Sequence, residues 1–171
     1  FIGNAILYNK LCKWIKTPIK QGSLLNYDNL CIVHGISGVG KTYGITKAIE
    51  ECGKVCVAYN IELKDIKTNV TKIVTSDILS QFTNVKLSDK ILFIDELETL
   101  LAIDRSFMVS LCQLFETIPA IKIIIASITF DTKFAGKILD FKIPVPSEQE
   151  IILFLKQTFP ELTSQDLLDI S

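Results

Sequence analysis

The sequence predicts an α/β fold: a three-layer domain with a parallel five-stranded sheet, followed by the start of a small helical lid. Short apolar runs, typical of strands buried on both faces, alternate with segments whose apolar residues recur at helical spacing. After Pro146 this alternation stops and only helical patterns follow. We therefore expect an N-terminal helix and lead-in loop (1–29), a core (30–146) and the first part of a lid (147–171).

Each expected strand is a short apolar run bounded by polar residues, glycine or proline. In chain order these runs are residues 30–33, 54–59, 91–94, 121–126 and 141–145, the last ended by Pro144 and Pro146. The expected helices are residues 4–16, the segment from the glycine-rich loop to Gly53, 66–79, 107–115, the segment from Ser147 to Pro160, and 163–170. The polar stretch 20–29 is expected to form a loop.

A glycine-rich run follows the first expected strand and fits the phosphate-loop pattern G-x-x-x-x-G-K-[ST] at every required position. Its glycines let backbone N–H groups approach phosphate oxygens at the positive end of the next helix. Lys41 supplies a charge for the β and γ phosphates, and Thr42 a hydroxyl for Mg²⁺. The strand–loop–helix order argues against a chance match in a glycine-rich turn. The residues expected to bind ATP are Gly35, Ile36, Ser37, Gly38, Val39, Gly40, Lys41, Thr42 and Tyr43.

A second motif, Asp95-Glu96, directly follows the apolar run 90–94. Ligands gather at the carboxyl ends of parallel strands, so we expect Asp95 to lie near Thr42 and to hold Mg²⁺ through its water shell. Glu96 would orient and activate the attacking water, with Lys41 as the other catalytic residue. The alternative is a strand followed by an acidic helix cap, since Asp and Glu are common there.

Composition and charge fit one nucleotide-binding domain. The chain has 171 residues, of which 49% are hydrophobic, which is ample for a core of this size. The net charge of −1 gives no overall basic field that would favour nucleic acid, and the local lysine groups are interpreted as solvated faces. We expect no membrane segment and no signal peptide. Because the sequence begins with Phe1, we expect a fragment or a processed product.

Five cysteines are present, and no two form a C-x-x-C pair. We interpret them as small buried residues in a reducing compartment, not as a disulfide framework or a zinc site. The expected location is therefore intracellular, in the nucleus or the cytoplasm, including a viral replication site. The one histidine, His34, is expected to be packed or hydrogen-bonded and not catalytic.

The residues Gly35–Thr42, Asp95-Glu96 and Ser127 occur in the order and spacing of an AAA+ ATPase, which the chain resembles over nearly its whole length. Ser127 falls where that family places its sensor 1 residue, so the resemblance implies a catalytic role for it. Within AAA+ ATPases the chain is most similar to the clamp-loader clade, particularly the large subunits of replication factor C. The supporting segments are residues 9–14, 58–60 and 139–144. Origin-recognition initiators carry similar patterns.

The resemblance implies an ATP-hydrolysing subunit of a DNA-replication assembly that loads a sliding clamp onto DNA. Its partners would be other AAA+ subunits in a hetero-oligomeric ring, a sliding clamp and primer–template DNA. Two alternatives stay open. The first is another AAA+ role, as an origin initiator, a helicase loader or a transposition regulator. The second is a nucleotide-binding scaffold with negligible hydrolysis.

One departure from the clamp-loader pattern concerns arginine. Small clamp-loader subunits carry a Ser-Arg-Cys motif whose arginine reaches a neighbour's ATP, and here Gly136-Lys137-Ile138 stands in its place. Lysine cannot reproduce the planar guanidinium. The only arginine, Arg105, follows the acidic motif and is interpreted as a surface charge in preference to a trans-acting finger. A large subunit, which receives a finger and gives none, would show this departure. The sensor 2 arginine of the lid is expected beyond Ser171.

Overall fold

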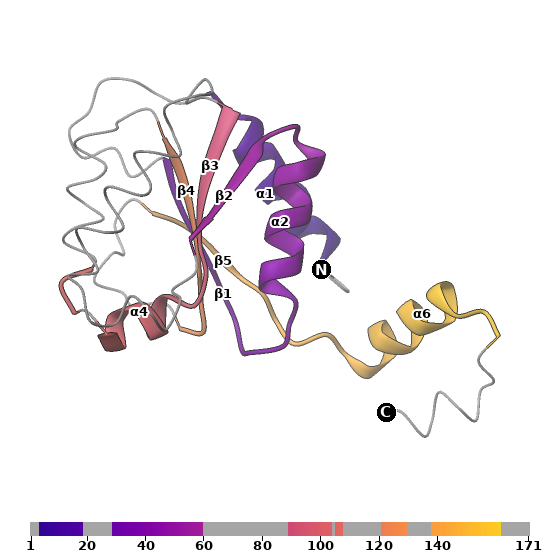
Figure 1. Cartoon of the computed structure of the whole chain (residues 1–171). Helices are drawn as coiled ribbons and strands as arrows, with labels where there is room; N and C mark the ends of the chain where they lie inside the picture. Colours follow the sequence, from indigo (N-terminus) through magenta and orange to yellow (C-terminus); the bar gives the residue numbers. More distant parts are fainter. Residues whose placement is uncertain are drawn as a thin grey trace.

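The computed structural model describes residues 4–18, 29–59, 89–103, 105–107, 121–129 and 138–161. In this part of the chain, helices cover both faces of a sheet (Figure 1). The described helices are α1 (Ala5–Lys16), α2 (Lys41–Glu51), α4 (Leu97–Ile103) and α6 (Glu148–Thr158). The strands are β1 (Leu30–His34), β2 (Val55–Tyr59), β3 (Lys90–Ile94), β4 (Lys122–Ser127) and β5 (Leu139–Lys142).

The five strands form one sheet in the order β2-β3-β4-β1-β5, and every neighbouring pair is parallel. This confirms the predicted fold class. His34 at the end of β1 pairs with Ser127 at the end of β4, and Ile94 at the end of β3 pairs with Ile125. The loops that follow β1, β3 and β4 therefore leave from the same edge of the sheet. This register brings residues from three distant parts of the sequence to one place.

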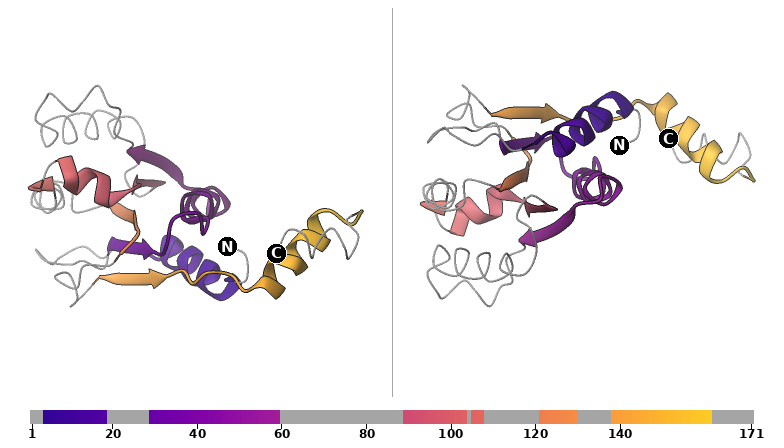
Figure 2. Two further views of the ribbon diagram at one scale, coloured as in Figure 1. Left: turned by 90° about the horizontal axis from the view of Figure 1, so that it is seen from below. Right: turned by 90° about the horizontal axis from the view of Figure 1, so that it is seen from above.

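Alternate strand residues point to opposite faces, and each face has its own apolar core. One core packs Ile32, Leu92 and Ile125 against Leu97 and Leu100 of α4. The other packs strand residues against α1 and α2; its members include Leu11, Ile15, Val33, Ile45, Ile49, Phe93 and Ile124. Figure 2 shows α1 and α2 together on one side of the sheet, opposite α4. Burial on both faces explains why the central strands are continuous apolar runs.

The structure corrects two expectations. The fifth strand is Leu139–Lys142 and not residues 141–145. The amide of Ile143 still donates to the carbonyl of His34 (2.8 Å), but Pro144 has no N–H with which to continue the ladder. The strand also begins earlier than expected, at Leu139. Its first two residues are exposed because β5 lies at the edge of the sheet, so they show no apolar pattern. Helix α4 was not expected at all.

The other expected elements match the structure closely in the described residues. Several expectations lie outside the described residues: the helices 66–79 and 163–170, most of 107–115, nearly all of the loop 20–29, and the residues Lys137 and Cys112. None of the described helices has the length and apolarity needed to cross a membrane.

Helix α1 is fixed to the sheet by Lys122, a lysine inside an apolar strand. Its side chain is almost buried, with 5% of the residue exposed. The ammonium donates to the carbonyl oxygens of Trp14, Ile15 (3.0 Å) and Thr17 (2.6 Å), at the end of α1 where the regular hydrogen bonding of the helix stops. It also lies 4.7 Å from the centroid of the Trp14 ring. Burial, followed by the positive charge of Lys54, lowers the pKa of Lys122 to about 8.

Helix α6 begins with the capping pattern expected from Ser147-Glu148-Gln149-Glu150. The hydroxyl of Ser147 accepts from the amide of Glu150 (3.4 Å), and the amide of Ser147 donates to Oε2 of Glu150 (2.7 Å). This backbone hydrogen bond holds the pKa of Glu150 below its ordinary value. No residue of α6 is fully buried, and the helix extends away from the sheet (Figure 2).

Candidate nucleotide site

The phosphate loop connects β1 to α2 and has the backbone that its glycines permit. Gly38 (φ 84°) and Gly40 (φ 83°) lie in the left-handed region, where a side chain is disfavoured. Gly35 is needed for a different reason, because a Cβ there would lie 2.6 Å from the carbonyl oxygen of Ile143. The loop therefore runs against the end of β5. It leads directly into the N-terminus of α2, the positive end of that helix.

Lys41, the first residue of α2, reaches back across the loop. Its ammonium donates to the carbonyl oxygens of Gly35 (2.7 Å) and Ile36 (2.8 Å). The contact with Gly35 is partly buried, so the charge is held against the loop. An anion that approached the loop would meet both the helix end and this ammonium.

Thr42 and Asp95 are in direct contact, so Asp95 lies near Thr42 as the sequence predicted. The hydroxyl of Thr42 donates to Oδ2 of Asp95 (2.7 Å). The other carboxylate oxygen, Oδ1, accepts from the amide of Glu96 (3.0 Å). Both oxygens are therefore held in place. A hydroxyl and a carboxylate are the oxygen ligands that Mg²⁺ favours, so the pair fits such an ion.

Glu96 has an unusual backbone, since its φ of 50° is the only positive value of a non-glycine residue in the described part of the chain. Its carbonyl accepts from the amide of Thr99 (2.9 Å) and so begins helix α4. Its carboxylate accepts from the hydroxyl of Thr99 (3.3 Å). Residues in sparsely populated backbone regions cluster at functional sites, which is consistent with a chemical role for Glu96.

The loop, the acidic pair and the end of β4 surround one cavity of about 470 Å³, which we name the phosphate cavity. The functional side chains on its wall are Lys41, Thr42, Asp95, Glu96, Glu98 and Thr99. The structure thus brings the loop together with both predicted carboxylates. It also adds Glu98 and Thr99, which the sequence analysis did not single out.

Ser127 is placed differently from the other predicted residues. Only 4% of it is exposed, and the described residues that line the phosphate cavity include its neighbours Ala126 and Ile128 but not Ser127 itself. Its hydroxyl lies 2.8 Å from the carbonyl oxygen of Thr129 and 3.1 Å from Oε2 of Glu98, and donates toward both. Its sensor 1 role stays a prediction, and in this conformation the hydroxyl contacts both the Thr129 carbonyl and Glu98 of α4.

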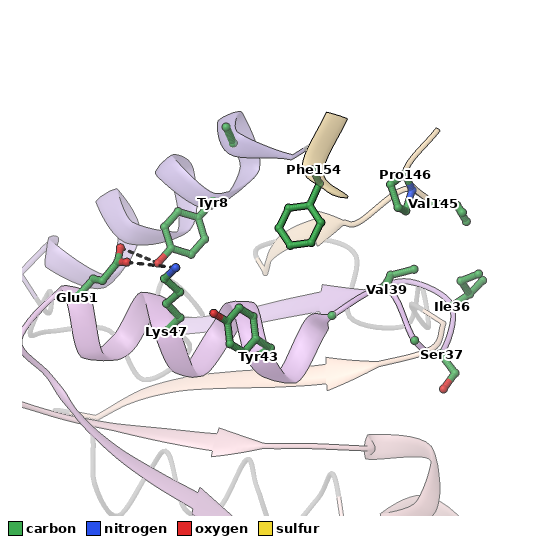
Figure 3. A pocket seen from close by; sticks show the side chains of 13 residues that line it. Tyr8, Ile36, Ser37, Val39, Tyr43, Lys47, Glu51, Val145, Pro146 and Phe154 are labelled. Atoms are coloured by element: carbon green, nitrogen blue, oxygen red, sulfur yellow. Dashed lines mark hydrogen bonds and ion pairs between the residues drawn. The ribbon is translucent and has the colours of Figure 1, made fainter. Parts of the chain in front are cut away.

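A second cavity of about 780 Å³ lies on the other side of the loop, and we name it the apolar cavity. Figure 3 shows Tyr8 of α1, Tyr43 of α2 and Phe154 of α6 around it, with Val145 beside Pro146. It shares Tyr43 and several loop residues with the phosphate cavity. A largely apolar cavity with aromatic walls, next to an anion-binding loop, has the character of a nucleoside site.

One end of the apolar cavity carries polar groups. The hydroxyl of Tyr8 donates to Oε2 of Glu51 (2.7 Å), and the Lys47 ammonium lies 3.9 Å from Oε1 of Glu51 (Figure 3). Burial and then this hydrogen bond raise the pKa of Tyr8 well above its ordinary value. The contact joins α1 to α2 at the wall of the cavity. No sequence pattern indicated it, because it depends on how α1 packs.

His34 and Arg105 lie as the sequence predicted, but the expectation of buried cysteines holds only for Cys31; Cys12, Cys52 and Cys56 are partly exposed. His34 is hydrogen-bonded to Asp140 of the neighbouring strand (3.3 Å). The four described cysteines are free, and burial raises the pKa of the Cys31 thiol. Arg105 is exposed in the turn after α4. Among the described residues, no group of three or more His, Cys, Asp or Glu side chains could hold a metal ion.

Residues 31–132 match the family described as "ATPase family associated with various cellular activities (AAA)". The chain belongs to the AAA family. This agrees with the P-loop sheet and with the AAA+ resemblance of the sequence, and the family suggests ATPase activity. The match is to the AAA family as a whole and does not distinguish the clades within AAA+. No curated protein matches the sequence significantly.

Two solved structures have the same fold as this AAA domain. One is titled "Structure of C. elegans PCH-2"; it aligns with a TM-score of 0.64 at 16% identity over 92% of this chain. The other is titled "Replication initiator DnaA bound to AMPPCP and single-stranded DNA"; it aligns with a TM-score of 0.58 at 17% identity over 98% of this chain. The alignments span 47% and 56% of those two proteins, so this chain corresponds to about half of each.

Proposed function

We propose that this AAA domain binds ATP together with Mg²⁺ and hydrolyses it as one subunit of a larger assembly. The observation that carries the proposal is the 2.7 Å hydrogen bond from Thr42 to Asp95. It joins the phosphate loop to the acidic strand end on the wall of one cavity. A phosphate loop alone would support binding. A carboxylate pair beside it supports chemistry as well.

Each residue of the phosphate cavity has a role in this proposal. The loop amides and the Lys41 ammonium bind the β and γ phosphates. Thr42 and, through water, Asp95 are the residues that would hold Mg²⁺; when bound, this ion neutralises charge on the phosphate oxygens. Glu96 orients the attacking water and takes its proton, and the Thr99 hydroxyl holds the Glu96 carboxylate for that purpose.

The apolar cavity would receive the nucleoside. Tyr43 and Phe154 offer aromatic faces to a base, and Tyr43 lies on both cavities, at the junction of nucleoside and phosphates. Since Phe154 belongs to α6, nucleotide binding would also bring the lid helix into contact with the core. This gives the lid a way to respond to ATP.

For the biological role we propose a clamp-loader-like subunit that acts with other AAA+ subunits on a sliding clamp and primer–template DNA, inside the cell. The support is the resemblance carried by residues 9–14, 58–60 and 139–144. The runner-up is an origin-initiator or helicase-loader role. The similarity to the DnaA structure, whose title names AMPPCP and single-stranded DNA, is compatible with both. A scaffold that binds ATP without hydrolysis is the third outcome.

Calorimetric titration with ATP, with and without Mg²⁺, tests the proposed binding. Wild type should bind more tightly with Mg²⁺. Lys41→Ala should weaken binding by roughly 10- to 100-fold, because charge-assisted hydrogen bonds to phosphate are worth about 1.5–3 kcal/mol. Lys10→Ala, on the exposed surface of α1, is the matched control and should bind like wild type. Equal affinities of wild type and Lys41→Ala would overturn the proposal. Binding without turnover, even with partner subunits present, would favour the scaffold.

A further inference from the structure

We infer that Glu98 is a positioning residue for the proposed ATPase site: it fixes the end of β4 against the phosphate cavity and couples that strand end to the phosphate loop. The inference deepens the proposed function and rests on it. Glu98 lies in the first turn of α4 and forms part of the cavity wall. The roles proposed above for Lys41, Thr42, Asp95, Glu96 and Thr99 do not include it.

One oxygen of Glu98 holds two groups at the end of β4. Its Oε2 accepts from the hydroxyl of Ser127 (3.1 Å) and from the backbone amide of Ile128 (3.2 Å). Hydrogen bonds to a carboxylate are stronger than those between neutral groups. Ile128 is the residue that turns onto the cavity wall, and 43% of it is exposed. Glu98 therefore sets where the strand ends and where the wall begins.

The contact continues to the phosphate loop. The amide of Gly35 donates to the carbonyl oxygen of Ser127 (3.2 Å), so Ser127 touches α4 through its hydroxyl and the loop through its carbonyl. Gly35 in turn has no room for a Cβ against the end of β5. A shift of α4 would move Ser127, and a shift of Ser127 would move the loop that binds phosphate. In the described part of the chain, Glu98 joins α4 to this strand end through hydrogen bonds to Ser127 and Ile128.

The charge of Glu98 distinguishes positioning from simple attraction of the ligand. A carboxylate on the wall of an anion site repels phosphate, so it does not favour nucleotide binding by itself. Removing the charge while keeping an acceptor oxygen should therefore preserve positioning and slightly improve affinity. Removing the acceptor should release the strand end. Glu98→Gln and Glu98→Ala separate these two effects. Ser127→Ala removes one of the two hydrogen bonds that Glu98 accepts and also removes the contact of the hydroxyl with the Thr129 carbonyl oxygen.

The kinetic test measures nucleotide affinity and turnover of the full chain, with its partner subunits where turnover needs them. Glu98→Ala should lower kcat about tenfold or more and leave KM within about threefold, because small misplacements of reacting groups are costly. Glu98→Gln should keep most of the kcat with an equal or lower KM. Glu148→Ala, in the first turn of α6, is the matched control and should keep the wild-type kcat. A Glu98→Ala enzyme with wild-type kcat, or a Glu98→Gln enzyme as poor as Glu98→Ala, would overturn the inference.

A second measurement does not depend on ATP. Amide hydrogen exchange at Ile128 should be faster in Glu98→Ala than in wild type and close to wild type in Glu98→Gln. Exchange at Ile124, inside β4, should be unchanged in both variants and so report that the sheet is intact. Unchanged exchange at Ile128 in Glu98→Ala would overturn the inference. If wild type failed to bind ATP while the exchange result held, the proposed function would be wrong and the structural coupling would stand.

Discussion

The hydroxyl of Thr42 donates a 2.7 Å hydrogen bond to Oδ2 of Asp95, a residue 53 positions later in the chain. Sheet order explains the contact. Strands β1 and β3 both flank β4, and all three are parallel, so the loop after β1 and the carboxylates after β3 leave from one edge. The second oxygen of Asp95 is held by the amide of Glu96. The Glu96 carboxylate instead accepts from the hydroxyl of Thr99. The two carboxylates thus have different side-chain partners and can be tested separately.

Glu96→Gln should leave ATP affinity within about threefold of wild type and suppress turnover by roughly 10²–10⁴-fold, the range expected for loss of a general base. The substitution keeps the size of the side chain and removes the group that accepts the proton. Affinity by calorimetry and turnover by phosphate release, measured on the same preparation, check it. Turnover at the wild-type rate would mean that another group activates the water.

Asp95→Asn should give a different result from Glu96→Gln. The amide can still accept from Thr42, but it lacks the charge that favours a divalent cation. We expect the Mg²⁺ concentration for half-maximal ATP binding to rise severalfold, with little change in binding measured without Mg²⁺. Titration of Mg²⁺ at fixed ATP is the measurement, with Glu148→Gln as a charge control outside the site. Identical Mg²⁺ curves for Asp95→Asn and wild type would exclude Asp95 from the metal site.

Gly35 and Gly38 provide a matched pair for the phosphate loop. In Gly35→Ala the new Cβ would lie 2.6 Å from the Ile143 carbonyl, so the loop and the end of β5 must separate. We expect a loss of about 1–3 kcal/mol of unfolding free energy, typical of overpacking, together with weaker ATP binding. In Gly38→Ala the Cβ meets no atom within 4 Å, and only the left-handed backbone is disfavoured, by about 1–2 kcal/mol. Urea unfolding of Gly35→Ala, Gly38→Ala and wild type, with and without ATP, measures both stability and ATP binding. A Gly35→Ala protein that bound ATP normally would contradict the steric argument.

Lys122 predicts a particular dependence of stability on pH. Its folded pKa of about 8 lies below the ordinary 10.5, so between these values the unfolded chain binds more protons than the folded chain. Its contribution to the free energy of unfolding is therefore lowest below pH 8 and rises toward pH 10.5, by at most about 1.4 kcal/mol per pH unit. The unfolding free energy of wild type minus that of Lys122→Met should therefore rise with pH in that window. The same difference for Lys156→Met should stay constant. Urea unfolding from pH 7 to 10 checks this, and a constant difference for Lys122→Met would contradict it.

Much of this site could be predicted from the sequence, because its central residues carry their own signals. The phosphate loop is a contiguous motif, and an apolar run followed by two carboxylates identifies Asp95 and Glu96. Glu98, Thr99 and Tyr8 could not be predicted in the same way, since each acts through a contact that depends on packing. Helix α4 was missed although Leu97 and Leu100 have helical spacing, because the helix is short and begins at the acidic motif itself. The burial of the Lys122 ammonium could not be predicted either, because the residue lies in a strand of apolar residues that carry no signal for a buried charge.

The last prediction concerns the arginine that the phosphate cavity lacks. The transition state of phosphoryl transfer spreads negative charge over the γ-phosphate oxygens, and an arginine supplied in trans can raise the rate by roughly 10³–10⁵-fold. Among the described residues, Lys41 is the only cation on the wall of the phosphate cavity, and Arg105 is exposed beyond α4. We therefore expect the isolated chain to be a slow ATPase.

Turnover should rise when a partner subunit places an arginine opposite Gly35–Thr42, because ATP would then be enclosed between the two subunits and would favour the closed assembly. The measurement is turnover of the chain alone against turnover with candidate partner subunits, with and without primed DNA. Arg105→Ala is the internal control: if this residue only forms part of the surface, its loss leaves both rates unchanged. Full turnover by the chain alone, as a monomer, would rule out this mechanism, since the charge that stabilises the transition state would then have to come from Lys41 and Mg²⁺ without a neighbour.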